Sequence, residues 1–225
     1  MLFILLLNYL LMKFYWIKSH FLIKKIFSNY IWSVPNRSKI VYLTFDDGPT
    51  PKITDFVLSE LNKFNAKATF FCIGENIRKH PELFQNILNQ GHQIGNHTFN
   101  HLNGWQNNDQ IYLENAVQCE NEISNLSASQ NKLFRPPYGK IKTSQANLLI
   151  KKGYKIIMWD VLSADFDISV SKEKCLENVV KNVESGSIIV FHDSVKAFPN
   201  MEFALPKTLT ILKERGFTFK SLKFD

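Results

Sequence analysis

The sequence predicts an α/β fold built from about seven successive βα units. Short apolar segments rich in β-branched and aromatic residues alternate with amphipathic segments, about one pair every 25 to 35 residues. Polar motifs follow several of the predicted strands directly. Both βα barrels and doubly wound sheets place their chemistry at the carboxyl ends of their strands. The 225 residues, 45% of them hydrophobic, suffice for one domain with a sizeable core.

The predicted strands and helices alternate without interruption. The first strand, 39–45 (KIVYLTF), is apolar and β-branched, as expected of a buried strand. Helix ends are indicated by a proline at the first helical position or a glycine just past the last, as at Pro81 and Gly91. Further strands are expected at 68–73, 93–96, 133–134, 155–159, 187–191 and 217–222, and helices at 54–64, 81–90, 113–126, 145–152, 173–183 and 205–215.

The first 38 residues form a separate segment, and the domain proper is expected at 39–225. Residues 1–12 are apolar but too few to span a bilayer. A secretory signal needs positive charge before the apolar run and a small-residue cleavage site after it, and both are missing. Residues 13–32 mix aromatic, aliphatic and lysine side chains, which favours a helix lying in a membrane interface. The alternative is a helix that packs on the domain.

Charge and cysteine content restrict the partners and the location. The formal net charge of +7 favours anionic partners, although basic residues without acids between Lys13 and Arg37 supply part of the excess. The sequence has no nucleic-acid motif, so no nucleic-acid partner is expected. Cys72, Cys119 and Cys175 form no CxxC or metal-knuckle pair, so we expect three reduced, buried thiols. We expect a monomer at the cell envelope or a membrane surface, with the cytoplasm as the alternative location.

The first polar motif, 44–49 (TFDDGP), ends the first strand. Two adjacent carboxylates repel each other unless a positive charge lies beside one of them. A metal ion bound to one of Asp46 and Asp47 would leave the other free to act as a base. The alternative is a simple turn, because Asp-Gly-Pro is a good turn sequence.

The second motif, 97–101 (HTFNH), supplies two imidazoles. His97 and His101 stand at i and i+4, on one face if the segment is helical. With one carboxylate they make a three-ligand metal site that keeps an open position for water. Two polar loop histidines are the alternative. The nearby His92 precedes the strand and is expected at the surface.

Two further motifs add polar groups at other strand ends. In 135–139 (RPPYG), the prolines and glycine predict a rigid turn that can present a backbone N–H to an oxyanion, while Arg135 can pair with a carboxylate. His192 follows a continuous apolar strand and can act as a general acid. An acid from another strand end, Asp160 or one of 165–167 (DFD), could pair with His192 or Arg135. Taken singly, each motif also fits a surface turn, a capping histidine or a solvated acidic loop.

The order and spacing of these motifs resemble the polysaccharide deacetylase family. This carbohydrate esterase group includes chitin, chitooligosaccharide and peptidoglycan N-acetylglucosamine deacetylases. The resemblance covers residues 39–222. It implies a distorted, incomplete (β/α)7 barrel with seven parallel strands. It also implies a metal-dependent hydrolase that removes N-acetyl groups from N-acetylated sugars, with an N-acetylglucosamine polymer or oligomer as substrate.

The resemblance also implies a role for each candidate residue. Asp47, His97 and His101 resemble the ligands of one divalent metal ion, commonly zinc, with cobalt, nickel or manganese as alternatives. Asp46 resembles the catalytic base, and Arg135 resembles the arginine that holds that base.

Three more positions complete the implied site. Tyr138 matches the residue whose backbone N–H helps to bind the oxyanion, and His192 resembles the general acid. Asp165 is the candidate for tuning His192 or steadying Arg135. Family members often have Asp-Trp where this chain has Asp165-Phe166, which keeps an aromatic wall and loses the indole N–H.

Two other functions remain as alternatives. A related amide hydrolysis, such as deformylation or deacylation of a lipid-linked amino sugar or another linear or cyclic amide, would suit the basic, aromatic N-terminus. A catalytically inactive carbohydrate-binding barrel would be expected to lack a ligand or the base, and all of those positions are filled here.

Overall fold

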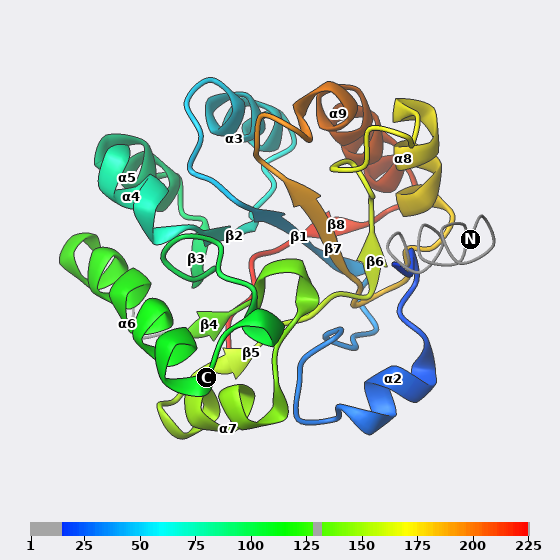
Figure 1. Ribbon diagram of the computed structural model, residues 1–225. Helices are drawn as coiled ribbons and strands as arrows, with labels where there is room; N and C mark the ends of the chain where they lie inside the picture. Colours follow the sequence, from blue (N-terminus) through cyan, green and yellow to red (C-terminus); the bar gives the residue numbers. More distant parts are fainter. Residues whose placement is uncertain (1–14, 128–131, 225) are drawn as a thin grey trace, which may run out of the picture.

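Seven parallel strands curl into a half-barrel in the computed structural model, which describes residues 15–127 and 132–224 (Figure 1). The strand order is β5-β4-β3-β2-β1-β7-β6, and an eighth strand, β8 (Thr218–Phe219), pairs with the start of β1 (Ile40–Asp46). Read from β6, this order follows the chain around a barrel, whereas a doubly wound sheet reverses direction. The predicted incomplete barrel is confirmed.

The central strand β1 has one apolar face and one face whose carboxyl-terminal half is polar. Side chains alternate across a strand, so Leu43 and Phe45 pack in the main core among the surrounding helices. Thr44 and Asp46 point to the opposite face, where both bond Arg135. The other strands are β2 (Thr69–Cys72), β3 (Gln93–Asn96), β4 (Leu133–Phe134), β5 (Lys155–Ile156), β6 (Val161–Leu162) and β7 (Ile188–His192).

Helices surround the strands and largely follow the predicted ranges. The last long helix starts at Phe198, earlier than predicted. Pro199 lies in its first turn, where proline is favoured, and the helix continues through Pro206. A short helix at 74–79 was not predicted. The helices are α3 (Ile53–Lys63), α4 (Gly74–Lys79), α5 (Pro81–Asn89), α6 (Asp109–Leu126), α7 (Thr143–Lys151), α8 (Lys172–Val180) and α9 (Phe198–Glu214).

The strand predicted at 155–159 is shorter in the structure, where β5 covers only Lys155–Ile156. A second short strand, β6, follows at Val161–Leu162 on the opposite edge of the sheet and was not predicted. β5 pairs with β4, and β6 pairs with β7. Between them lies the open seam of the half-barrel, and the N-terminal segment fills it. The Ile31 N–H donates to the Ile156 carbonyl at 2.8 Å, and the Leu162 N–H donates to the Ile17 carbonyl at 2.8 Å. These backbone groups would otherwise stand at unpaired strand edges.

A buried carboxylate fastens the N-terminal segment to the seam. Asp160 is fully buried between β5 and β6, and both of its oxygens are paired. Lys18 lies 2.6 Å from one oxygen, Lys24 pairs with the other, and the Ser187 hydroxyl donates at 2.5 Å. Burial alone would raise the pKa of Asp160, but these donors lower it below its ordinary value. The ionised carboxylate therefore ties residues 18–24 to the barrel.

Other predictions about buried and exposed residues can now be compared with the structure. The three cysteines are free and buried, as predicted. The prediction that His92 lies at the surface was wrong: it is buried, and its Nδ1 accepts from the Ala68 N–H at 3.2 Å. Residues 1–14 lie outside the described residues. Within 15–38 there is one helix, α2 (Phe21–Ile26). In the part of the chain that is described, no helix has the length and apolar character to cross a membrane.

Replacing Asp160 with asparagine should destabilise the fold by about 2–3 kcal/mol at pH 7. The change leaves two ammonium groups near a buried site without a counter-charge, and the partial exposure of both lysines moderates the cost. Because the folded-state pKa of Asp160 is lowered, its contribution is present above about pH 4 and is lost as the pH falls further. Urea unfolding followed by circular dichroism at pH 7 and pH 3 measures both effects.

Glu184→Gln is the matched control, because Glu184 also pairs with Lys18 but is well exposed. It should cost less than about 1 kcal/mol. Equal destabilisation by the two variants would contradict a special role for the buried carboxylate.

Candidate active site

Parallel strand register brings the sequence motifs to one edge of the half-barrel. Asp46 ends β1 and His192 ends β7, and the two residues are register partners. The segments after β3 and β4 carry His97 and Arg135 to the same edge. A cavity of about 620 Å³ opens there. Its lining includes Tyr15, Asp46, Asp47, His97, His101, Tyr138, Lys140, Trp159, Phe166, His192 and Lys196.

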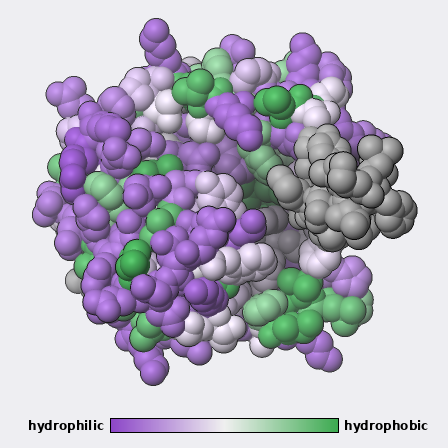
Figure 2. Space-filling model, in the orientation of Figure 1, coloured by the Kyte–Doolittle hydropathy of each residue, from purple (hydrophilic) through white to green (hydrophobic). Residues whose placement is uncertain are grey.

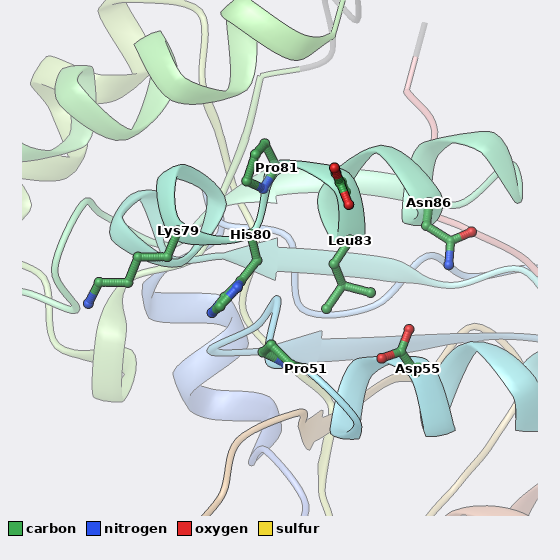
Figure 3. A pocket seen from close by; sticks show the side chains of 8 residues that line it. Pro51, Asp55, Lys79, His80, Pro81, Leu83 and Asn86 are labelled. Carbon is green, nitrogen blue, oxygen red and sulfur yellow. The ribbon is translucent and has the colours of Figure 1, made fainter.

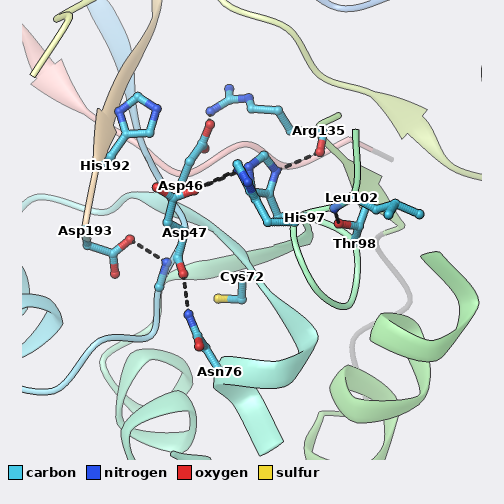
Figure 4. A network of polar contacts seen from close by, with 12 residues as sticks. Asp46, Asp47, Cys72, Asn76, His97, Thr98, Leu102, Arg135, His192 and Asp193 are labelled. Atoms are coloured by element: carbon cyan, nitrogen blue, oxygen red, sulfur yellow. Dashed lines mark hydrogen bonds and ion pairs between the residues drawn. The ribbon is translucent and has the colours of Figure 1, made fainter. Parts of the chain in front are cut away.

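Asp47, His97 and His101 form a cluster in this cavity. Each offers one ligand atom, and these atoms lie within 4.8 Å of one another. The Asp47 Oδ1 lies 3.3 Å from the His101 Nε2 and 3.7 Å from the His97 Nε2. Figure 4 shows Asp47 and His97. The two histidines are not on a helix, contrary to the helical arrangement considered from their spacing. Thr98 and His101 adopt left-handed backbone conformations, and this compact loop brings the imidazole rings to 5.1 Å.

The hydrogen bonding of His97 leaves its Nε2 free to bind a cation. Its Nδ1 lies 2.8 Å from the Arg135 carbonyl oxygen (Figure 4). A carbonyl accepts and cannot donate, so the proton sits on Nδ1 and the Nε2 lone pair faces Asp47. Burial lowers the pKa of His97 to about 4, which keeps the ring neutral.

An unpaired buried oxygen provides the test of whether a metal fits. The Asp47 Oδ1 is buried and has no hydrogen-bond partner among the described residues. A carboxylate oxygen facing a neutral imidazole lone pair is repulsive unless a cation lies between them. One carboxylate and two imidazoles therefore fit a divalent metal with an open position for water.

The neighbouring carboxylate, Asp46, is held by a different charge. Its Oδ1 accepts from the Arg135 Nη1 at 2.7 Å, and that nitrogen also bonds the Thr44 hydroxyl at 2.7 Å. Arg135 is completely buried, and its guanidinium lies 4.2 Å from the centre of the Phe71 ring. Asp46, at the end of β1, thus faces Arg135, whereas Asp47, directly after the strand, faces the two imidazoles, as their different predicted roles require.

His192 is paired with Asp165 on the opposite side of the cavity. Its Nδ1 lies 2.8 Å from the Asp165 Oδ1, and its backbone N–H donates to the Oδ2 at 2.8 Å. Burial would lower the pKa of His192, but the Asp165 carboxylate, with Asp47 and Asp46 behind it, raises it to about 9. Of the acids considered from the sequence, Asp165 is the partner of His192, and Asp46 is the partner of Arg135.

The RPPYG turn has the tight backbone that its glycine predicts. Tyr138 has φ +60° and Gly139 has φ +66°, both left-handed. A Cβ at Gly139 would lie 2.6 Å from the Trp159 ring, so the turn packs directly on that indole. The Tyr138 ring is exposed and stands 4.5 Å from the His101 ring. The turn therefore forms one wall of the cavity, and the oxyanion role of the Tyr138 N–H stays a prediction.

The sequence analysis did not single out Asp193, although it follows His192 directly. Asp193 is fully buried and accepts from the Gly48 N–H at 3.0 Å and the Thr54 hydroxyl at 2.5 Å (Figure 4). Burial raises the pKa of Asp193 to about 7. A Cβ at Gly48 would lie 2.0 Å from the carboxylate, so the glycine of TFDDGP is needed there. Asp193 fixes the turn that carries Asp47.

A second hollow lies away from these motifs, between the loop before α3 and the helices α4 and α5 (Figure 3). Its volume is about 530 Å³. Two of its charged groups already have partners: Asp55 accepts from the Lys52 N–H, and Lys79 pairs with Glu75. The candidate chemistry therefore concentrates in the first cavity.

The fold and this cavity define a half-barrel with a candidate metal-dependent hydrolytic centre. The family model described as polysaccharide deacetylase matches residues 33–157, more than half of the chain. The chain belongs to the polysaccharide deacetylase family. The predicted family and enzyme class, polysaccharide N-deacetylase, are thereby confirmed, and the reaction class is deacetylation of N-acetylated sugar polymers.

Known relatives agree with this assignment. A peptidoglycan-N-acetylglucosamine deacetylase of Bacillus cereus is 37% identical over 189 residues, which cover 84% of this chain and 88% of the relative. A peptidoglycan-N-acetylmuramic acid deacetylase of Bacillus subtilis is 32% identical over 190 residues, 83% of this chain and 71% of the relative. A crystal structure of a peptidoglycan N-acetylglucosamine deacetylase, bound to a substituted N-hydroxybenzamide, matches with TM-score 0.81 and 35% identity, covering 86% of this chain and 91% of that one.

The His192–Asp165 pair predicts a specific change in pH dependence. With its raised pKa, His192 keeps its proton at neutral pH and loses it only as the pH rises through about 9. Asp165→Asn removes the negative charge, so the pKa of His192 should fall and the basic limb of kcat/KM should move down by about 1–2 pH units. Rates of acetate release between pH 6 and pH 10 measure this shift.

Asp167→Asn is the control, because Asp167 bonds Tyr15 and Ser169 rather than His192. Its basic limb should stay in place. An unshifted limb in folded Asp165→Asn protein would remove His192 as the group that titrates there.

Proposed function

We propose that the protein is a metal-dependent hydrolase that removes the N-acetyl group from N-acetylglucosamine units of peptidoglycan. One observation carries this proposal: the unpaired, buried Asp47 Oδ1 faces the Nε2 atoms of His97 and His101, beside a separately held Asp46. The names of the similar proteins, several of them peptidoglycan deacetylases, support the choice of polymer. Chitin oligomers and lipid-linked amino sugars are the alternative substrates.

The roles of the residues follow from their contacts. Asp47, His97 and His101 would hold the metal, which when bound supplies a Lewis acid and makes water more acidic. Asp46, fixed by Arg135, is placed to take the proton from the attacking water. His192 is protonated at neutral pH and donates to the leaving sugar amine. The N–H of Tyr138 is the proposed donor to the oxyanion, a contact typically worth about 3–4 kcal/mol.

Zinc is the proposed metal. One carboxylate with two imidazoles is a ligand set that zinc accepts, and cobalt, nickel and manganese are alternatives because selectivity depends partly on availability. The hydrogen bond from the His97 Nδ1 to the Arg135 carbonyl oxygen fixes the orientation of the ring for coordination.

Acetate release tests the function directly. The protein should release acetate from peptidoglycan fragments and N-acetylated oligosaccharides, and a chelator should stop this release. Asp46→Asn should lower kcat by at least about 100-fold while the metal content stays unchanged, because its role is proton transfer. His97→Ala should lose bound metal, measured by elemental analysis after dialysis, because one of three ligands is gone.

Two results would contradict the proposal. Full activity in the presence of a strong chelator would exclude the metal. Metal binding without acetate release from any N-acetylated sugar would favour the inactive carbohydrate-binding barrel.

We also propose that the protein associates with a membrane surface through its N-terminal segment. Trp16, Phe21, Leu22 and Ile26 are exposed on and just before α2, beside Lys25. Hydrophobic residues gather over α2 at the lower right of Figure 2. Apolar side chains bordered by lysine suit the interface of an anionic membrane.

Co-sedimentation with vesicles of anionic phospholipid measures this association. The double variant Phe21→Ser, Ile26→Ser should bind about tenfold more weakly, because it removes two interfacial apolar side chains. Ile168→Ser is the control, since Ile168 is an exposed apolar residue in the loop before α8. Equal binding by the double variant and the control would reject α2 as the membrane contact.

A further inference from the structure

The N-terminal segment enters the fold at the catalytic edge of the barrel. Lys18 forms an antiparallel bridge with Val161 of β6, and the Leu162 N–H donates to the Ile17 carbonyl. In an antiparallel pair, each step backward in one strand is a step forward along the other. Residues 15 and 16 therefore lie beyond the carboxyl end of β6, next to the loop with Asp165 and Phe166. Tyr15 reaches the cavity for this reason.

Tyr15 is held in the cavity wall by two contacts. Its hydroxyl donates to the Asp167 Oδ2 at 2.8 Å, and its ring packs edge-on against Phe166 with centroids 5.3 Å apart. Phe166 in turn lies 5.0 Å from the His192 ring. Burial, and then the bond to Asp167, raises the pKa of Tyr15, so the hydroxyl remains a donor. Tyr15 thus extends the aromatic surface that begins at the candidate general acid.

We propose that Tyr15 is a substrate-contacting residue, an aromatic wall against which a pyranose ring of the bound sugar chain packs. This inference rests on the proposed function in requiring that a sugar occupies the cavity. Tyr15 lies outside the residues 33–157 that match the family model, so the contact is an addition made by the N-terminal segment.

The chemistry of the cavity fits this ligand. A pyranose has an apolar face of C–H groups, which are attracted to the electron-rich face of an aromatic ring. Tyr138 lines the cavity beside His101, and Phe166 lines it beside His192. Trp159 and Tyr15 also line the cavity, and Tyr15 packs against Phe166. Aromatic side chains thus lie beside both histidines. Such a site holds a sugar ring while Asp46 and His192 remain free for proton transfer.

The position of Tyr15 depends on the seam contacts that follow it in sequence. The Ser19 N–H donates to the Asp160 carbonyl at 2.9 Å, and the Ser19 hydroxyl donates to the Trp159 carbonyl at 2.6 Å. Lys18 pairs with the buried Asp160 carboxylate. These contacts hold residues 18 and 19 against the barrel and thereby position Tyr15 in the cavity wall.

Binding of an N-acetylated tetrasaccharide to the metal-loaded, full-length Asp46→Asn protein tests the inference without turnover. Isothermal titration calorimetry should give a Kd about tenfold higher when Tyr15→Ala is added, and Tyr15→Phe should retain most of the affinity because the ring remains. Phe21→Ala is the matched control. It removes an exposed ring of the same segment that does not line the cavity, and it should leave the Kd unchanged.

Kinetics on the otherwise unchanged protein separate binding from chemistry. Tyr15→Ala should raise KM for the tetrasaccharide about tenfold and change kcat less than twofold. Tyr15→Leu keeps apolar packing against Phe166 and should show the same loss of affinity, so it decides the matter if the alanine variant does not fold.

The possible results separate this inference from the proposed function. Unchanged Kd in a folded Tyr15→Ala or Tyr15→Leu variant, or no binding of the tetrasaccharide at all, overturns the role of Tyr15. An equal loss in Phe21→Ala also overturns it, because the effect is then not specific to the cavity. If the tetrasaccharide binds through Tyr15 but the unmodified protein releases no acetate, the proposed function fails and the contact stands.

Discussion

The buried guanidinium of Arg135 is the interaction on which the rest of the site depends. Removing this charge from water costs several kcal/mol, and the surrounding groups must offset that cost. They do so from two parts of the barrel: Asp46 and Thr44 on β1, and the carbonyls of residues 157 and 158 in the seam. The Arg135 carbonyl also accepts from His97. One residue therefore fixes both the candidate base and the orientation of a candidate metal ligand.

The buried Arg135 also explains how two adjacent carboxylates can have different roles. Asp46 is the last residue of β1 and points into the barrel toward Arg135. Asp47 follows with φ +84°, a left-handed turn that directs its side chain to the imidazoles. The turn is held from behind by the buried Asp193 carboxylate on the Gly48 N–H. Backbone geometry, rather than any difference in side-chain chemistry, gives the two acids their separate partners.

The N-terminal segment packs in the open seam of the half-barrel. Two-residue strands at the edges of a sheet leave unpaired backbone groups, and residues 17–31 pair with them on both sides. The buried Asp160 and its two lysines fix this closure. A segment that looks like a membrane-surface helix by composition is thus partly a component of the barrel. The apolar side chains of Phe21, Leu22 and Ile26 on α2 stay exposed.

The sequence alone determined the half-barrel family, most of the strands and helices, and the residues gathered in the cavity. Local patterns carry this information, because buried strands are continuous in apolar residues and the motifs directly follow strand ends. Tertiary structure decided which acid pairs with which cation, the loop conformation at 97–101, the buried state of His92, and the placement of β5 and β6 at opposite edges of the sheet. These features arise from contacts between residues far apart in the chain, such as Tyr15 with Asp167 and Lys18 with Asp160. Periodicity within a segment cannot encode such contacts, since they exist only after the barrel has closed.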